Sequence, residues 1–191
     1  MKINVTLNKS SIQKAIKTLK QQKKILLEQA IPEYLKRSAE RIQELANQNL
    51  NRWDIGDNVK EAIKDSWFIK NISNTHIVLY NISRKAAYVE FGVGIIGQTD
   101  KHPNADNTGY EYNVQTEYKF GQGFWQFTVE DRSWLDIPED AIIYQDFNKA
   151  GESIITQGTQ GAWYLFNAIE DFKLREAKPL WEEVKKKYWS K

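Results

Sequence analysis

The apolar residues in the first 50 positions recur at helical spacing. From Leu27 to Leu50 they repeat every three or four residues, which predicts a long amphipathic helix. A shorter helical pattern precedes it, with Ser10 or Ser11 as the expected cap of its first turn. The basic run "KQQKK" is expected to separate the two helices. Pro32 is expected near the start of the second one, because the first helical turn tolerates proline.

Short runs of β-branched and aromatic residues predict strands. The runs "SWFIKNIS" and "HIVLYNIS" predict an antiparallel hairpin with its turn between Asn71 and Thr75. The alternating apolar positions of "KINVTL" predict a short strand at the N-terminus. Four later runs are further strand candidates: "YEYNVQT", "GFWQFTV", "AIIYQDF" and "ESIITQG".

The stretch "RKAAYVEFGVGIIG" predicts two helical turns that end at Gly92 and Gly94, where the chain turns. A long loop is expected over residues 97–109. A final helix is expected after Gly161, kinked or split at Pro179 because proline breaks the helical hydrogen-bond ladder.

This order of elements predicts an α+β fold, with an antiparallel sheet packed by N-terminal and C-terminal helices and a long loop-rich insertion in the middle. The length of 191 residues fits a single domain over residues 1–191. Within it we expect a helical part at 1–50, sheet and loops at 51–160 and a C-terminal helix at 161–191.

Composition excludes several kinds of site. The chain has no Cys and only 2 His, which excludes thiolate metal sites, disulfides and histidine-rich metal centres, so we expect no metal and no cofactor. No apolar run reaches the roughly 18 residues of a membrane span, and the N-terminus lacks the apolar core of a secretion signal. We therefore expect a chain that is made in the cytoplasm and does not enter a membrane.

Charge is unevenly distributed along the chain. Residues 1–50 contain 10 Lys/Arg against 4 Asp/Glu, a net of +6, and residues 95–160 contain 4 Lys/Arg against 11 Asp/Glu, a net of −7. Such a split favours either a charged partner or neighbouring copies that meet basic face to acidic face. Two independently solvated faces are the alternative.

The candidate catalytic and binding motifs are weak. The glycines of "GVGIIG" have neither the spacing of a dinucleotide fingerprint nor the Lys-Ser/Thr of a phosphate-binding loop. Asp100, His102 and Asp106 could ligate a metal, but a polar turn fixed by Pro103 is the favoured interpretation. Glu90 is expected to cap or pair structurally rather than to act as a base, since no nucleophile or partner acid lies near it in the sequence.

Three blocks of the sequence, in this order, resemble the tail-completion, or head-tail joining, proteins of long-tailed bacteriophages. The blocks are "AAYVEFGVGIIG", "HPNADNTGYEYNV" and "TQGTQGAWYLFNAIEDF". Val93 departs from the threonine usual in the first block, and Ala162 and Trp163 stand where the third block usually has a proline. The resemblance extends over about residues 34 to 172.

The resemblance implies a non-enzymatic virion protein of the neck that completes the tail or joins head to tail by ring assembly. Its implied partners are further copies of itself, other neck proteins and the tail tube or tail terminator, while DNA passes without specific binding. The glycines would then form a structural corner that presents the following loop. The corner and loop residues are Tyr88, Glu90, Phe91, Gly92, Gly94, Gly97, His102 and Pro103.

Ring closure requires unlike faces of neighbouring copies to meet. The basic helix from Lys14 to Arg41 and the acidic segment from Asp100 to Asp146 are the predicted faces, and tryptophans are predicted contact anchors. The residues predicted to form assembly interfaces are Lys14, Arg37, Arg41, Tyr110, Tyr112, Trp125, Trp134, Trp163 and Phe166.

Two other functions remain open from the residues. The aromatic strand candidates from Tyr110 to Phe127 would suit sugar stacking, which makes a carbohydrate-binding module the alternative. A nucleic-acid-processing enzyme is a distant third, because these aromatic residues lie in the acidic segment, which repels phosphate.

Overall fold

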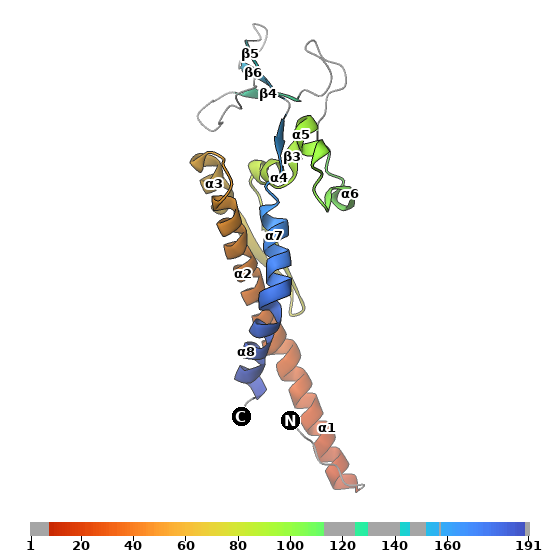
Figure 1. Cartoon of the computed structure of the whole chain (residues 1–191). Coiled ribbons are helices and arrows are strands. Elements are labelled where there is room, and N and C mark those ends of the chain that lie inside the picture. Colours follow the sequence, from red (N-terminus) through yellow and green to blue (C-terminus); the bar gives the residue numbers. More distant parts are fainter. Residues whose placement is uncertain (1–7, 113–124, 130–141, 146–151, 157, 190–191) are drawn as a thin grey trace. The chain divides into compact units, whose positions relative to one another are not determined.

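The computed structural model describes residues 8–112, 125–129, 142–145, 152–156 and 158–189 (Figure 1). The expected strand "KINVTL", at residues 2–7, lies outside them.

Contacts group the chain into two compact units, each made of separate stretches of sequence. Unit 1 comprises Met1–Leu45, Phe68–Tyr80 and Ile169–Lys191, and unit 2 comprises Ala46–Trp67 and Asn81–Ala168. The single domain over residues 1–191 stays a prediction.

The described residues of the first 50 are almost entirely helical, as predicted. Helix α1 spans Lys9–Ile25, a π-helical turn, η1, spans Leu26–Ala30, and helix α2 spans Ile31–Asn51. The predicted break at "KQQKK" is wrong, because this run lies inside α1, where lysine and glutamine are good helix formers.

The predicted cap of the first helix is also wrong. Asn8 is the capping residue, and its side-chain oxygen accepts a hydrogen bond from the amide of Ser11 at 2.8 Å. Asparagine and serine are both good capping residues, so the sequence did not decide between neighbouring positions.

A π-helical turn precedes each proline of the long helices. Pro32 follows η1, and Pro179 follows a second such turn, η3, at Phe172–Glu176. In η1 the amide of Ile31 bonds to the carbonyl of Leu26, five residues back. We predicted a kink or a split at Pro179, and the split is wrong, because helix α8 continues through this residue over Ala177–Trp189. The widened turn accommodates the disturbance of the hydrogen-bond ladder.

The C-terminal helix begins after Gly161, as predicted. Helix α7 spans Tyr164–Asp171 and runs through η3 into α8. Within unit 1, α8 lies beside α2 (Figure 1). The two helices are antiparallel, because Glu33, Arg37 and Arg41 of α2 bond to Lys187, Glu183 and Glu176 in that order. The buried apolar side chains of unit 1 include Ala39, Phe172 and Val184.

The predicted hairpin is confirmed. Strand β1 spans Trp67–Ser73 and strand β2 spans His76–Asn81, with the turn at Asn74 and Thr75. These two strands, with the helices on either side of them in the sequence, make the chain an α+β protein.

Unit 2 contains short helices that the sequence did not reveal. Helix α3 at Asp57–Lys64 was not anticipated, and helices α5 at Gly94–Thr99 and α6 at Ala105–Thr108 replace much of the expected loop over 97–109. Glycine is a poor helix former, so the local sequence of α5 does not predict it. Its contacts with strand β7, at Gly158–Gln160, override that preference.

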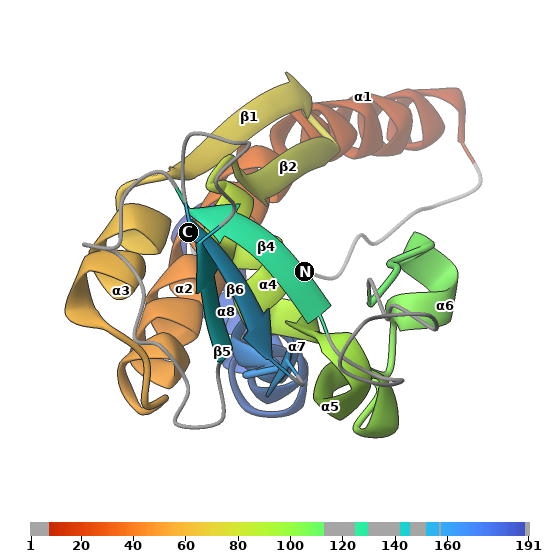
Figure 2. The same cartoon turned by 90° about the horizontal axis from the view of Figure 1, so that it is seen from above.

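A three-stranded antiparallel sheet forms from three of the predicted strand runs (Figure 2). Its members are β4 at Trp125–Val129, β5 at Ile142–Gln145 and β6 at Glu152–Thr156, with β6 in the centre. The run "YEYNVQT" is not a strand at residues 110–112, and its remainder lies outside the described residues.

Candidate functional site

Helix α4, at Arg84–Phe91, ends in a tight corner at Gly92, as predicted. Gly92 has a φ of 79°, a left-handed conformation that glycine adopts easily because it lacks a Cβ. Gly92 and Val93 then form strand β3 and pair with Gln160 and Thr159 of β7. The corner therefore turns the chain directly from a helix into a sheet.

Gly161 packs against the backbone of this corner. A Cβ on Gly161 would lie 2.6 Å from the carbonyl oxygen of Glu90 and 2.6 Å from the carbonyl carbon of Phe91. The next amide, that of Ala162, donates to the carbonyl of Val89 at 2.7 Å. The close approach of two backbones explains why this position requires glycine.

The carboxylate of Glu90 receives the first amides of helix α7. Its Oε2 accepts from the amide of Leu165 at 2.8 Å, and its Oε1 accepts from the amide of Phe166 at 2.9 Å. The amides at a helix N-terminus have no partners inside the helix, and the helix dipole favours a negative charge there. Glu90, only 6% exposed, thus caps a helix that begins more than 70 residues later. This agrees with the expectation that Glu90 has a structural role.

His102 supplies the third donor to Glu90. Its Nδ1 accepts from the amide of Asn104 at 3.0 Å, so Nε2 carries the ring proton and donates to Glu90 Oε1 at 3.0 Å. This tautomer is assigned from the hydrogen-bond pattern. The backbone amide of His102 donates to the hydroxyl of Tyr112 at 2.9 Å. His102 is 3% exposed, so the expected polar turn is a buried part of the core.

Aromatic rings enclose the Glu90–His102 pair. The Phe91 ring lies 4.3 Å from the His102 ring and stacks on Tyr110 at 4.5 Å between centroids. The Tyr110 hydroxyl donates to the carbonyl of Gly92 at 2.7 Å. Burial raises the pKa of Tyr110, which keeps this hydroxyl protonated as a donor. We call the residues from Glu90 to Phe166 that meet here the Glu90 cluster; its members are Glu90, Phe91, Gly92, His102, Tyr110, Tyr112, Gly161, Trp163 and Phe166.

Trp163 is the strained member of the Glu90 cluster. Its φ is 49°, an uncommon backbone conformation for a residue with a side chain. Its indole ring lies edge-on to His102 and Phe166. Within the described residues its buried Nε1 has no hydrogen-bond acceptor. The sequence had only suggested a contact anchor here.

The acids of the candidate metal loop do not converge. Asp100 accepts from the side chain of Gln160, Asp106 pairs with Lys101, and His102 is bonded to Glu90. In the described part of the chain, no group of three His, Asp or Glu side chains is arranged to hold a metal ion. The imidazole and carboxylate of the Glu90 cluster bind each other and backbone amides, which is an arrangement for holding backbone in place.

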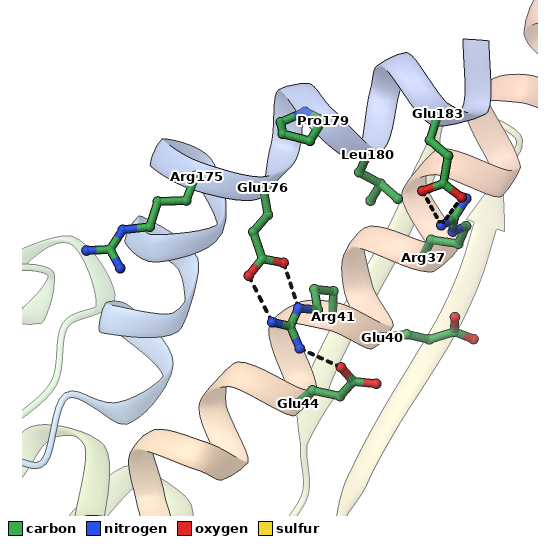
Figure 3. Close-up of a pocket in the computed structure, with 9 residues that line it drawn as sticks. All are labelled: Arg37, Glu40, Arg41, Glu44, Arg175, Glu176, Pro179, Leu180 and Glu183. Carbon is green, nitrogen blue, oxygen red and sulfur yellow. Dashed lines mark hydrogen bonds and ion pairs between the residues drawn. The ribbon is translucent and has the colours of Figure 1, made fainter. Parts of the chain in front are cut away.

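Unit 1 contains the second feature, a charged groove of about 440 Å³ between α2 and the C-terminal helix (Figure 3). Arg41 donates to both oxygens of Glu176, at 2.6 and 2.9 Å, and also to Glu44 at 2.8 Å. Arg37 donates to both oxygens of Glu183 at 2.9 Å. The residues that line the groove are Arg37, Glu40, Arg41, Glu44, Arg175, Glu176, Pro179, Leu180 and Glu183.

These pairs extend into an ion-pair ladder along the two antiparallel helices. Its third rung joins Glu33 to Lys187 at 2.6 Å, with the Tyr188 hydroxyl donating to the same carboxylate oxygen at 2.8 Å. Hydrogen bonds from Arg41 hold the pKa of Glu176 below its ordinary value, and Lys187 does the same for Glu33. The ladder consists of the pairs Glu33–Lys187, Arg37–Glu183 and Arg41–Glu176.

The predicted interface residues fall into different environments. Arg37 and Arg41 are engaged in the ladder, and Tyr112 is buried in the Glu90 cluster. Lys14 is exposed on α1. Trp125 lies in β4, and Trp134 lies outside the described residues.

The remaining corner and loop residues have separate positions. Tyr88 is 43% exposed on α4, and Pro103 is exposed just before α6. Gly94 begins α5, and Gly97 is buried within it. The sequence therefore identified the corner, whereas it did not indicate the close packing of Gly161 or the amides of Leu165 and Phe166 that bind Glu90.

No family model, no curated protein and no solved structure matches this chain. Among the residues that the structure describes, no helix is both long and apolar enough to span a membrane.

Proposed function

We propose that this chain is a structural protein of a phage or prophage neck, which completes the tail or joins head to tail as part of a ring. In this role it is a non-enzymatic virion protein. Its partners are copies of itself, other neck proteins and the tail tube or tail terminator.

One observation carries the proposal: the three sequence blocks on which the resemblance rests make contact with one another. Glu90 of the first block bonds to His102 of the second and to the amides of Leu165 and Phe166 of the third. Gly161 of the third block packs on the backbone of the first. Glu90, His102 and Phe166, which are among the residues that match the family pattern, thus help to hold one corner together, which is what residues shared for a common fold would do.

The chemistry of the Glu90 cluster favours binding over catalysis. A general base must be able to reach a substrate proton, but the Glu90 carboxylate is buried and receives three donors. A rigid corner instead suits a subunit that must keep its shape while neighbouring proteins contact it. The negative charge of residues 95–160 would also keep passing DNA from binding.

The test is deletion of the gene from the phage or prophage that encodes it, followed by electron microscopy of the lysate. We expect separate DNA-filled heads and tails, or tails with faulty ends. The wild-type chain supplied in trans is expected to restore joined, infectious particles, because the defect lies in assembly alone.

A pair of glycine variants serves as the matched control. Gly161→Val should fail to restore particles, because its side chain would enter the backbone of Glu90 and Phe91. Gly109→Ala should restore them, since nothing lies within 4 Å of a Cβ at that position. Intact infectious particles from the deletion strain would overturn the proposal, and binding to cell-wall sugars would then be the function to test.

A further inference from the structure

Helix α1 carries a concentrated positive charge. Residues 9–25 contain six lysines and neither Asp nor Glu, and all six lysines are exposed. Helix α2 differs, because Ile31–Asn51 contains three basic and three acidic residues. Among the residues that the structure describes, Lys24 alone of the six forms an ion pair, a long one of 3.9 Å with Glu28. The described part of the chain therefore leaves most of this charge without a counter-charge.

Four of these lysines share one face of the helix. At about 3.6 residues per turn they lie within roughly a quarter of the helix circumference, with Gln13 among them. At a rise of about 1.5 Å per residue they extend over about 22 Å along the helix axis. We call this surface the basic face; its lysines are Lys9, Lys17, Lys20 and Lys24.

The basic face is unfavourable for the helix on its own. Lys20 follows Lys17 by three residues and precedes Lys24 by four, and like charges at these spacings repel each other. The helix dipole favours Lys24 in the last turn, but it disfavours Lys9 in the first turn. In α2, by contrast, acids lie three or four residues after the bases and pair with them. The basic face is therefore better explained by an anionic partner than by the stability of α1.

An anionic bilayer does not match this arrangement. A helix that lies along such a bilayer has a broad apolar face opposite its charged face. Opposite the basic face, α1 has polar residues, among them Ser11 and Gln22. Its exposed apolar residues Ile12, Ile16 and Leu19 form a narrow row beside the lysines instead.

Repeated phosphates match the basic face better than a protein surface does. Lysine is depleted at protein interfaces, whose centres are mainly apolar and aromatic. The basic face consists of lysines and Gln13, and residues 9–25 contain no aromatic residue. Lysine binds phosphate as a point charge, and duplex DNA presents phosphates in a close and regular row.

We infer that the basic face of α1 binds duplex DNA through its phosphates, without reading the sequence. The acidic segment at residues 95–160 lies in unit 2, whereas α1 lies in unit 1, so repulsion and attraction of phosphate belong to different units. Contacts to phosphate alone let DNA slide, so they are compatible with DNA that passes through a neck. The inference goes beyond the proposed neck role and does not depend on it.

The experiment measures binding of the full-length chain to labelled duplex DNA by fluorescence anisotropy at several salt concentrations. The variant Lys17→Gln, Lys20→Gln removes two charges from the basic face. The control variant Lys178→Gln, Lys186→Gln removes two charges from exposed positions of α8. The two variants have the same net charge, and glutamine is about as good a helix former as lysine. Circular dichroism checks that both retain the helix content of the wild type.

We expect the wild-type chain to bind duplexes of unrelated sequence equally well. The logarithm of its affinity should fall linearly with the logarithm of the salt concentration, with a slope of about −3 to −4 for four phosphate contacts. The variant Lys17→Gln, Lys20→Gln should reduce the magnitude of this slope by about 2, because two phosphate contacts are lost. The α8 variant should keep the wild-type slope.

The inference is overturned if the wild-type chain does not bind duplex DNA at low salt, or if the two variants reduce the slope equally. Binding to phosphatidylserine vesicles without binding to DNA would overturn it as well, in favour of a lipid partner. These outcomes are separate from the deletion test. Joined particles without the gene reject the neck role even if α1 binds DNA, whereas separated heads and tails with a chain that does not bind DNA reject only this inference.

Discussion

The buried Glu90 carboxylate accepts hydrogen bonds from three donors. A buried charge is stable only when hydrogen bonds replace those it made to water. Leu165, Phe166 and His102 supply those bonds, and the first two lie at the positive end of α7. One side chain of α4 therefore bonds both to the loop that follows α5 and to the start of α7.

Replacing Glu90 with Gln should destabilise unit 2. The amide keeps one oxygen, but its NH2 group faces donors, so at least one buried N–H loses its acceptor. We expect a loss of about 2–3 kcal/mol in the free energy of unfolding, measured in urea. Glu61→Gln, on the exposed side of α3, is the control and should change it by less than about 0.5 kcal/mol. Equal effects of the two variants would contradict the capping role.

Gly161→Ala and Gly109→Ala separate steric clash from backbone strain. Alanine at 109 has space but must keep a φ of +65°, which costs about 1 kcal/mol. Alanine at 161 would place its Cβ 2.6 Å from backbone atoms of α4, so the backbone must shift. We expect Gly161→Ala to lower the thermal midpoint by clearly more than Gly109→Ala. The reverse order would show that the two backbones are not in close contact.

For single residues, the sequence predicted the structural roles of Gly92 and Glu90 but not the residues that they contact. The spacing around Gly92 indicated a corner, and the absence of a nearby nucleophile indicated a structural Glu90. The donors to Glu90 lie 12, 75 and 76 residues away in the chain, and no local pattern specifies such pairs. The burial of His102 was missed because its neighbours in sequence are polar.

Among the elements, α2 and the C-terminal helix are joined by the ion-pair ladder together with apolar packing. Tyr34 lies edge-on to Trp181 at 5.4 Å between centroids, beside the rung formed by Arg37 and Glu183. Exposed ion pairs contribute little singly, but the Arg41–Glu176 rung has the bidentate geometry that favours a fixed orientation, because Nε and Nη2 donate to separate carboxylate oxygens. The ladder therefore sets the register of the two helices.

The ladder predicts how the stability of unit 1 depends on pH. The pKa of Glu176 is lowered from its ordinary 4.5 by Arg41, and that of Glu33 is lowered by Lys187. A carboxylate with a lowered folded-state pKa contributes stability above its unfolded pKa, and this contribution is lost as pH falls through the folded value. We expect the thermal midpoint to fall below about pH 4.5.

The variant Glu176→Gln assigns that effect to the ladder. Glutamine does not titrate, so the variant should melt below the wild type at pH 7 and approach it at pH 3. Glu40→Gln lines the same groove outside the ladder and should follow the wild-type curve. A difference between Glu176→Gln and wild type that stays constant from pH 7 to pH 3 would contradict the assignment.

Elements with strong periodic patterns were predictable, and those formed by packing were not. The two N-terminal helices and the helix after Gly161 follow from apolar spacing, and the hairpin follows from its β-branched and aromatic runs and the turn residues between them. The π-helical turns before Pro32 and Pro179 could not be predicted, because they depend on how each helix accommodates a missing amide. Helix α5 forms despite two glycines, through its contact with β7.

For the whole molecule, the central proposal is that the chain is a structural subunit of a phage neck. The charge split and the Glu90 cluster are each consistent with a subunit that works by contact. The sequence resemblance gave the expected function, and the fold contributed the observation that the three resembling blocks meet in one corner.

The most direct measurement is rescue in vitro. Purified wild-type chain is added to a lysate of the deletion strain, which holds separate heads and tails, and the infectious titre is measured. We predict that the titre rises by orders of magnitude in proportion to added chain, because the heads and tails lack only this component. An unchanged titre with folded protein, or a deletion strain that already yields infectious particles, would contradict it.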